Sequence, residues 1–411
     1  MELPKSGLLP AVFSALLRPL VRFLDRHAQP KYQGELTLEG LKNSIEVVWD
    51  RHAIPQVSAT GELDLFFAQG FLHAQERLWQ MELSRRFLSG RMAEIFGDFS
   101  LPWKELSAQF RGRTSVDFDY FVRLIGIRRA AIASAAQLPE SAAHRLNAYS
   151  AGVNRFIELC DKKLPWEFRL LRHEPEPWTA EDTLTVQKGL AFLLSTALYT
   201  RLNFVAVAAR LEDQPDKLRS LMPTYPDDAP TIARALWSQT RSLWEFTSAD
   251  MTNSGFHTAG HGSNSWVVAP HRSSSGGALL ANDPHLRMTL PSIWYLMHLL
   301  ADEGSAGNGS YEVWGATIPG IPFVQIGHNR RIAWGVTAAV CDDVEVYREK
   351  IDDRESDRYL HVRDWRQITR FPERIGVRGK SAIEKTVRST HHGPIISEFG
   401  NPGGAREALS E

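Results

Sequence analysis

The sequence predicts an α+β fold in which a mostly helical N-terminal half is followed by a strand-rich C-terminal half. Apolar residues recur at helical spacing up to about residue 222. A polar, glycine-rich stretch at residues 250–262 has no such periodicity. From residue 263 onward, short apolar runs alternate with turn residues, which is typical of strands. The 411 residues suffice for two or three domain-sized units or for one large body.

Helical spacing in the N-terminal half predicts three helices, at residues 64–96, 138–161 and 181–198. Asp64 is the candidate N-cap of the first helix, and Gly97 is expected to end it. A strand is predicted before these helices at residues 44–49, followed by a turn at residues 50–55.

Five strands are predicted in the C-terminal half, at residues 265–268, 278–281, 311–314, 332–337 and 344–347. Turn residues such as Ser275-Gly276-Gly277 separate them. The pair His391-His392 is predicted to lie in a further turn, before Gly393-Pro394.

Composition and charge exclude several classes of protein. The net charge is −1 and no run of Lys or Arg is present, so a nucleic-acid partner is not expected. Two cysteines are too few for a disulfide framework or a structural zinc site. Residues 1–33 form a leader or amphipathic segment, whose apolar stretch is interrupted by Pro10, Arg18 and Pro19. Such a broken stretch is not expected to span a membrane.

Ser263 lies at the junction between the glycine-rich stretch and the first strand of the C-terminal half. The stretch suits either an ordinary interdomain loop or a site of proteolytic processing. No nucleophile elbow of the G-x-S-x-G kind is present to pair a serine with a histidine. If the bond between Gly262 and Ser263 is cut, Ser263 gains a free α-amino group, whose unperturbed pKa is about 7.7–8.0. This amine can then act as the base for the hydroxyl of the same serine. Because Gly262 has no Cβ, it permits the close approach that self-cleavage needs.

Several motifs, taken in order, resemble the penicillin acylase family of N-terminal-nucleophile hydrolases. They are residues 50–55 (DRHAIP), 68–71 (AQGF), 90–94 (GRMAE), 148–154 (AYSAGVN), 262–266 (GSNSW), 315–322 (GATIPGIP) and 333–335 (AWG). This resemblance implies a four-layer αββα sandwich. It also implies a precursor cut into an α chain and a β chain, with residues 34–249 as the α-chain part, 250–262 as a spacer and 263–411 as the β-chain part.

The resemblance also implies the site residues. Ser263 would be the nucleophile, after self-cleavage between Gly262 and Ser263. His285 would orient the free amine of Ser263, through its ring or its backbone carbonyl. The backbone N–H of Ala338 would supply half of an oxyanion hole. The family's second donor is an asparagine much further along the β chain, beyond Glu411.

No cofactor is expected for the chemistry itself, but a structural Ca²⁺ is implied by the resemblance at Asp342, Val344 and Glu345. These residues could offer three hard oxygen ligands. The family also uses a glutamate directly after a tryptophan, whereas here Thr179 follows Trp178 and the next glutamate is Glu181. A solvated acidic turn is the alternative interpretation.

Together these features predict a hydrolase acting on the linear amide of an N-acylated small molecule, such as a penicillin or an acyl-homoserine lactone. An α/β heterodimer derived from one precursor is expected, and family members are commonly periplasmic. Two alternatives stay open: a truncated, inactive member of the family, and a non-catalytic binding scaffold with the same fold.

Overall fold

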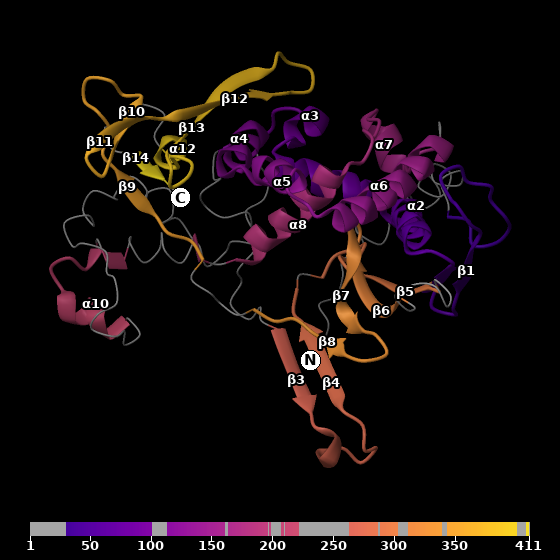
Figure 1. The fold of residues 1–411 in the computed structure, drawn as a ribbon. Helices are drawn as coiled ribbons and strands as arrows, with labels where there is room; N and C mark the ends of the chain where they lie inside the picture. Colours follow the sequence, from indigo (N-terminus) through magenta and orange to yellow (C-terminus); the bar gives the residue numbers. More distant parts are fainter. Residues whose placement is uncertain are drawn as a thin grey trace, which may run out of the picture.

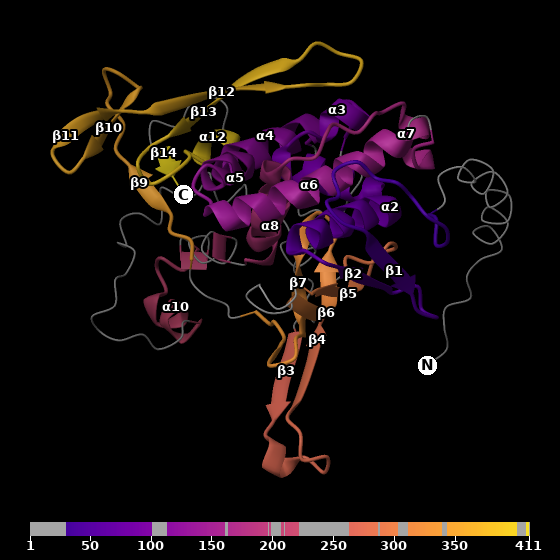
Figure 2. The same ribbon diagram turned by 45° about the vertical axis from the view of Figure 1, so that its right-hand side comes forward.

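A layer of helices lies between a six-stranded sheet and a long two-stranded ribbon (Figures 1 and 2). The computed structural model describes residues 30–100, 113–160, 163–195, 197–198, 207–208, 210–221, 263–286, 288–302, 311–338, 343–400 and 408–410. Within them, helices dominate before residue 222 and strands after residue 263, so the predicted order of the two halves is confirmed. The spacer 250–262 and almost all of the leader 1–33 lie outside the described residues.

The helical layer is formed from the N-terminal half of the chain. Its helices are α2 (Glu62–Ser89), α3 (Met92–Phe96), α4 (Ser115–Ile125), α5 (Ile127–Ala135), α6 (Glu140–Cys160), α7 (Trp166–Leu171) and α8 (Ala180–Leu194). Two shorter helices, α10 (Pro215–Leu221) and α12 (Ser397–Gly400), lie apart from this group in the sequence. None of the helices in the described ranges combines the length and apolar character needed to cross a bilayer.

The first predicted helix is divided in two, and its predicted cap is wrong. Gly90 adopts a left-handed conformation with φ of 65° and ends α2, and Gly97 then ends α3 as predicted. Gly61, not Asp64, is the N-cap of α2. Asp64 lies in the first turn and is buried, and its carboxylate accepts the backbone N–H groups of Lys42 and Asn43 at 2.9 and 3.1 Å. Asp64 therefore anchors the preceding loop instead of capping the helix.

Helices α2 and α6 cross with their backbones in contact. A Cβ atom on Gly70 would lie 2.0 Å from the carbonyl oxygen of Tyr149, and one on Gly152 would lie 1.9 Å from that of Phe67. Since any side chain at either glycine would overlap the facing backbone, the crossing requires glycine at both positions.

A buried polar chain connects this crossing to the sheet. The two ring nitrogens of His73, Nδ1 and Nε2, lie 2.8 Å from the Tyr149 hydroxyl and 2.9 Å from the Thr317 hydroxyl, respectively. The Tyr149 hydroxyl in turn accepts the backbone N–H of Gly320 at 2.9 Å. Burial lowers the pKa of His73 to about 3, so the ring is neutral at ordinary pH.

Charged residues of α2 are buried against α8 and the segment that precedes it. Glu82 contacts both Arg85 and Arg86, and Arg85 also reaches Asp182 of α8 at 3.2 Å. Burial alone would raise the pKa of Glu82, but the hydrogen bond with His173 and the two guanidinium groups lower it to about 2. The carboxylate therefore stays ionised inside the helical layer.

The six-stranded sheet covers one side of the helical layer. Its order is β1 (Ile45–Trp49), β2 (Pro55–Ala59), β5 (Tyr295–Ala301), β6 (Tyr311–Ile318), β7 (Ile321–His328) and β8 (Ala333–Trp334). Strands β2 and β5 pair in parallel, and the other neighbours pair antiparallel. Leu65 and Leu72 of α2 pack against Met297 and Leu299 of β5, so helix and sheet share one core.

Four two-stranded pairs complete the described strands. They are β3 (Ser263–Val268) with β4 (Leu279–Pro284), β9 (Tyr347–Glu349) with β14 (Ala408–Ser410), β10 (Arg358–His361) with β11 (Asp364–Gln367), and β12 (Thr369–Ile375) with β13 (Ile383–Ser389). Val387 of β13 packs on Phe118 and Phe121 of α4, which places the β12–β13 ribbon on the other side of the helical layer.

Most of the predicted strands occur, with different ends. The strands predicted at 265–268, 278–281 and 311–314 are present as β3, β4 and β6, and each is longer than predicted. The strand predicted at 332–337 is reduced to β8, and the one predicted at 344–347 is shifted to β9.

Candidate active site

Ser263 is the first residue of β3, in the hairpin that β3 forms with β4. The hairpin register places Ser263 opposite Pro284, so the residue after Pro284 lies beside the serine. Ser263 is half-buried. Gly262, the predicted residue before the cut, lies outside the described residues.

His285 contacts the Ser263 hydroxyl through its backbone. The backbone N–H of His285 donates a hydrogen bond to Ser263 Oγ, with a nitrogen–oxygen distance of 3.3 Å. Its ring does not make this contact, because Nε2 lies 2.9 Å from Asp283 Oδ2. The structure thus brings His285 to the predicted serine, but with the main chain facing the hydroxyl and the ring paired with Asp283.

The loop after β8 contacts Ser263 from another direction. The hydroxyl of Thr337 donates a hydrogen bond of 2.7 Å to the backbone carbonyl oxygen of Ser263. Ala338, the predicted oxyanion donor, follows Thr337 directly and is exposed. The hydrogen bond therefore holds the residue before the predicted donor against the predicted nucleophile.

Asn282 joins the hairpin to this loop. Its side-chain Nδ2 donates to the carbonyl oxygens of Asn264 and Val336 at 2.9 and 3.0 Å, and its Oδ1 accepts the backbone N–H of Val336 at 3.1 Å. A Cβ atom on Gly335 would lie 2.7 Å from Cβ of Asn282, so the loop approaches the strand closely at a glycine. This role of Asn282 was not predicted from the sequence, although Asn282 stands in the same N-D-P-H motif as His285.

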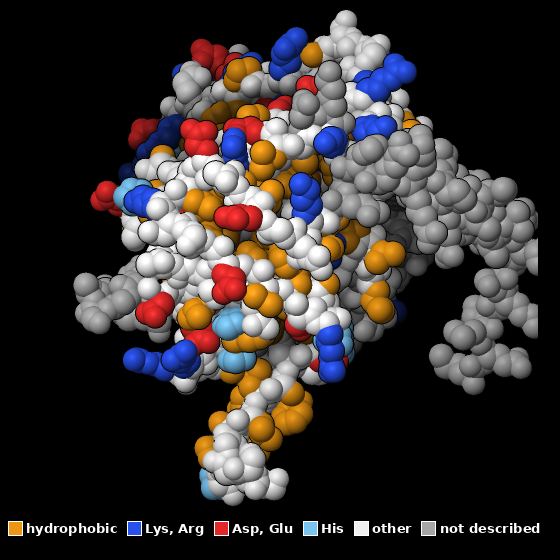
Figure 3. All heavy atoms as spheres, turned by 90° about the vertical axis from the view of Figure 1, so that its right-hand side faces the viewer, with side chains coloured by type: hydrophobic (Ala, Val, Ile, Leu, Met, Phe, Trp, Pro, Cys, Tyr) orange, Lys and Arg blue, Asp and Glu red, His pale blue; other side chains and the backbone are white. Residues whose placement is uncertain are grey.

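The hairpin that carries Ser263 projects from the rest of the molecule (Figures 1 and 2). Figure 3 shows hydrophobic side chains along this projection, at the bottom of the view. Trp266, Val267 and Leu279 are 57%, 72% and 49% exposed. These exposed apolar side chains lie on both faces of the hairpin, and large exposed apolar side chains are typical of surfaces that other protein segments cover.

Only part of the segment expected to bind Ca²⁺ is described, and Glu181 does not lie beside it. Thr179 is the N-cap of α8, where its backbone N–H donates to Asp182 at 3.0 Å. At the other end of α8, Ser195 donates to Asp343 at 3.0 Å. Glu181, near the first end, is therefore separated from the segment at 343–345 by about 20 Å of helix. Asp342 lies outside the described residues, so the calcium site expected at Asp342, Val344 and Glu345 stays a prediction.

Comparison with known proteins gives a consistent set of relatives. The family model described as penicillin amidase matches residues 44–410. Penicillin acylase 2 proenzyme from a Pseudomonas species is 32% identical over 382 residues, which cover 90% of this chain and 46% of that protein. Acyl-homoserine lactone acylase QuiP from Pseudomonas aeruginosa is 28% identical, with 91% of this chain and 42% of that protein covered. Penicillin G acylase from Escherichia coli is 26% identical, with 87% and 46% covered.

The chain spans somewhat less than half the length of these relatives. Among solved structures, thermostable penicillin G acylase from Alcaligenes faecalis in its orthorhombic form is 34% identical over 36% of this chain and 25% of that chain, with a TM-score of 0.31. Its tetragonal form is 24% identical over 46% of this chain and 98% of that chain, with a TM-score of 0.36.

Proposed function

Because the chain belongs to the penicillin amidase family, we propose that it is part of a self-cleaving amidohydrolase in which Ser263 attacks the amide of an N-acylated small molecule. One observation carries this proposal. The serine at the predicted cut is held from two sides, by the His285 backbone N–H on its hydroxyl and by the Thr337 hydroxyl on its carbonyl oxygen.

Maturation is the first proposed reaction. Oγ of Ser263 attacks the carbonyl carbon of Gly262, the peptide C–N bond breaks, and an ester forms while the nitrogen gains a proton. Water then cleaves the ester, leaving a carboxylate on Gly262 and an amine on Ser263. The half-buried position of Ser263 at the start of a strand supports this order, since the cut would fall just before the strand.

Acyl transfer is the second proposed reaction. The neutral amine of Ser263 takes the proton from Oγ as the oxygen attacks the substrate carbonyl. The same proton passes to the leaving amine, and an acyl ester remains on Oγ. Water hydrolyses this ester and releases the acid. One residue thus supplies both nucleophile and base.

Two further residues position the reacting groups in this proposal. The backbone N–H of Ala338 stabilises the negative oxygen of the tetrahedral intermediate, an interaction worth about 3–4 kcal/mol for each such donor. His285 is a positioning residue that holds the serine through its backbone while Asp283 fixes its ring. The Thr337 contact supports the placement of Ala338 beside Ser263.

For the complete protein we propose the four-layer αββα sandwich and an α/β heterodimer. In this assignment residues 34–249 belong to the α chain, 250–262 to the spacer and 263–411 to the β chain. The exposed apolar side chains of β3 and β4 support this assignment, because a second layer of protein would cover them.

Penicillins and acyl-homoserine lactones are the proposed substrates to compare first. Relatives are named for each: a penicillin acylase 2 proenzyme and an acyl-homoserine lactone acylase. Both classes carry a linear amide between an acyl group and a small amine, which is the bond that the proposed mechanism breaks.

The test compares Ser263→Ala with Ser265→Ala, a matched change two residues along the same strand. Each variant is expressed as this chain and with the downstream part of the protein restored. Wild type and Ser265→Ala should give a fragment that begins Ser-Asn-Ser-Trp and hydrolyse at least one of the two substrates. Ser263→Ala should remain one chain and be inactive. Normal cleavage in Ser263→Ala contradicts the proposal, and an intact wild type that binds ligand reversibly favours a non-catalytic scaffold.

A further inference from the structure

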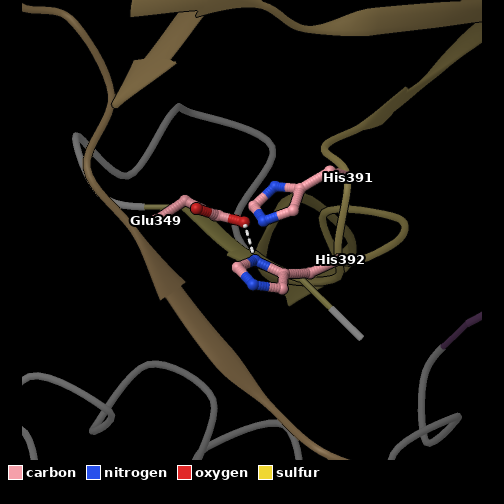
Figure 4. Close-up of side chains that lie close together, drawn as sticks. All are labelled: Glu349, His391 and His392. Carbon is pink, nitrogen blue, oxygen red and sulfur yellow. Dashed lines mark hydrogen bonds and ion pairs between the residues drawn. The ribbon is translucent and has the colours of Figure 1, made fainter. Parts of the chain in front are cut away.

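Two histidines and a buried glutamate meet at a place separate from Ser263. Glu349 is the last residue of β9, and His391 and His392 follow β13. One ligand atom from each of these three side chains lies within 4.8 Å of the other two. Figure 4 shows the Glu349 carboxylate directed at the two imidazole rings. The cluster lies well apart from the β3–β4 hairpin in Figures 1 and 2.

A tight turn explains how two consecutive histidines point the same way. The backbone N–H of Thr390 donates to the carbonyl oxygen of Gly393 at 2.9 Å, and Ser389 forms a bridge with Pro394. A turn is also what the sequence predicts for His391-His392 before Gly393-Pro394. In a strand, adjacent side chains would point to opposite faces. In the turn, the two ring centroids are only 3.7 Å apart.

Glu349 is held in place by several contacts. It is only 4% exposed. One of its oxygens, Oε1, accepts the Thr390 hydroxyl at 2.7 Å and lies 2.7 Å from Nδ1 of His392. The backbone N–H of His391 donates to the Tyr359 hydroxyl at 3.2 Å, and the His392 ring stacks on Tyr347. Side chains held in this way resemble a prepared ligand set, in which outer contacts orient the ligands.

We propose that Glu349, His391 and His392 form a binding site for a divalent transition metal, with Zn²⁺ as the best match. Two imidazoles and one carboxylate are a common zinc ligand set, and a solvent molecule completes the tetrahedron. At Zn–ligand distances of about 2.1 Å, neighbouring ligand atoms are about 3.4 Å apart. The exposed His391 ring supplies the small closing movement that this requires.

The chemistry of the donor atoms agrees with a transition metal. Nitrogen ligands also distinguish the site from a calcium site, since Ca²⁺ prefers oxygen ligands throughout. The two cysteines predict no structural zinc site, but Glu349, His391 and His392 bind a metal without any cysteine.

The test measures Zn²⁺ affinity of the full chain by isothermal titration calorimetry, and uses Co²⁺ absorption to report a tetrahedral site. His391→Ala is the main variant because its side chain is exposed and its backbone contact with Tyr359 is retained. His144→Ala is the matched control, since His144 is also an exposed histidine beside a glutamate, Glu140, at 3.8 Å. Glu349→Gln is the second variant, and it removes the negative charge of the proposed carboxylate ligand.

Wild type and His144→Ala should bind Zn²⁺ equally well and show the Co²⁺ band. His391→Ala should bind at least about tenfold more weakly and lose the band, and Glu349→Gln should do the same with an unchanged circular dichroism spectrum. Added Ca²⁺ should not weaken the binding of Zn²⁺ to the wild type. Equal Zn²⁺ affinity in wild type and His391→Ala would show that the cluster is a hydrogen-bonded group without a metal.

Discussion

The hydroxyl of Thr337 donates a hydrogen bond to the backbone carbonyl oxygen of Ser263, 74 residues earlier in the chain. This bond ties the loop after β8 to the first residue of β3. Because it uses the carbonyl oxygen, it fixes the main chain of Ser263 and leaves the hydroxyl available for reaction. The geometry of the proposed nucleophile therefore depends on a long-range contact that does not itself take part in the chemistry.

Replacement of Thr337 by valine should slow self-cleavage. Valine has nearly the same shape but cannot donate, so the Ser263 carbonyl loses its partner at a cost of about 1 kcal/mol. If this loss raises the activation free energy of self-cleavage by the full amount, the cleavage rate falls about fivefold. The rate is measured from the appearance of the smaller fragment on a denaturing gel. Thr337→Ser should restore it, and a valine variant that cleaves at the wild-type rate would contradict the expected role.

Loss of the Asn282 amide should release the loop from the hairpin. Asn282→Ala removes three hydrogen bonds, two of them to Val336. Hydrogen exchange followed by mass spectrometry should show faster exchange in a peptide that contains Val336. Ser275→Ala, in the turn of the same hairpin, is the control and should leave that peptide unchanged. Unaltered protection in Asn282→Ala would mean that the loop is held by other contacts.

His73 should make the protein less stable as the pH falls. Its pKa is about 3 in the folded protein and about 6.5 when unfolded. Below pH 6.5 the unfolded chain therefore binds a proton that the folded protein excludes, and stability falls until the pH reaches about 3. The expected slope from this one group is up to about 1.4 kcal/mol per pH unit.

The non-titrating variant His73→Gln isolates this contribution. Urea unfolding between pH 5 and 7 should show a shallower loss of stability in His73→Gln than in wild type. His144→Gln, which alters an exposed histidine, should keep the wild-type slope. Parallel curves for wild type and His73→Gln would show that His73 does not control this pH dependence.

Gly70→Ala should be strongly destabilising. The added methyl group would lie 2.0 Å from the Tyr149 carbonyl oxygen, so α2 and α6 would have to separate. We expect a loss of about 3 kcal/mol or more, or failure to fold. Gly277→Ala, in the turn between β3 and β4, is the control, because a Cβ atom there would meet only Ser275 Oγ, at an ordinary contact distance of 3.6 Å. The midpoint of thermal unfolding distinguishes the two, and equal midpoints would contradict the close packing described.

The helices were largely predictable because their apolar faces repeat over many turns. Helix α6 occupies residues 140–160, within two residues of the predicted range. The break at Gly90 was not predicted, because its left-handed conformation follows from contacts that form only in the fold. A Cβ atom there would lie 2.4 Å from the carbonyl oxygen of Asp119 in α4.

Several strands were not predictable from local pattern. Strand β5 (YLMHLLA) is rich in Leu and Met and suits a helix equally well, but it pairs with β2, more than 200 residues earlier in the sequence. Strands β12 and β13 carry charged residues among their apolar ones, and only Ile375 and Val387 are buried, so the apolar alternation is weak. Their conformation is set by pairing with each other.

The site was predictable where one short motif contains the residue, and unpredictable where two distant segments meet. Ser263 and His285 were identified from motifs on one hairpin. The pairing of Asn282 with Val336 joins segments 54 residues apart, and no local signal indicates it. The direction of the His285 ring depends on a rotamer that its neighbour Asp283 selects.

The glycine contacts between α2 and α6 also limit how this chain can be recombined with its relatives. Each helix presents to the other a backbone surface whose shape depends on one missing side chain, at Gly70 and at Gly152. A chimera that takes α2 from one parent and α6 from another will assemble only if each helix carries a glycine at the position where the two backbones touch. Crossover points in such libraries therefore belong outside residues 62–160, so that both helices are inherited together.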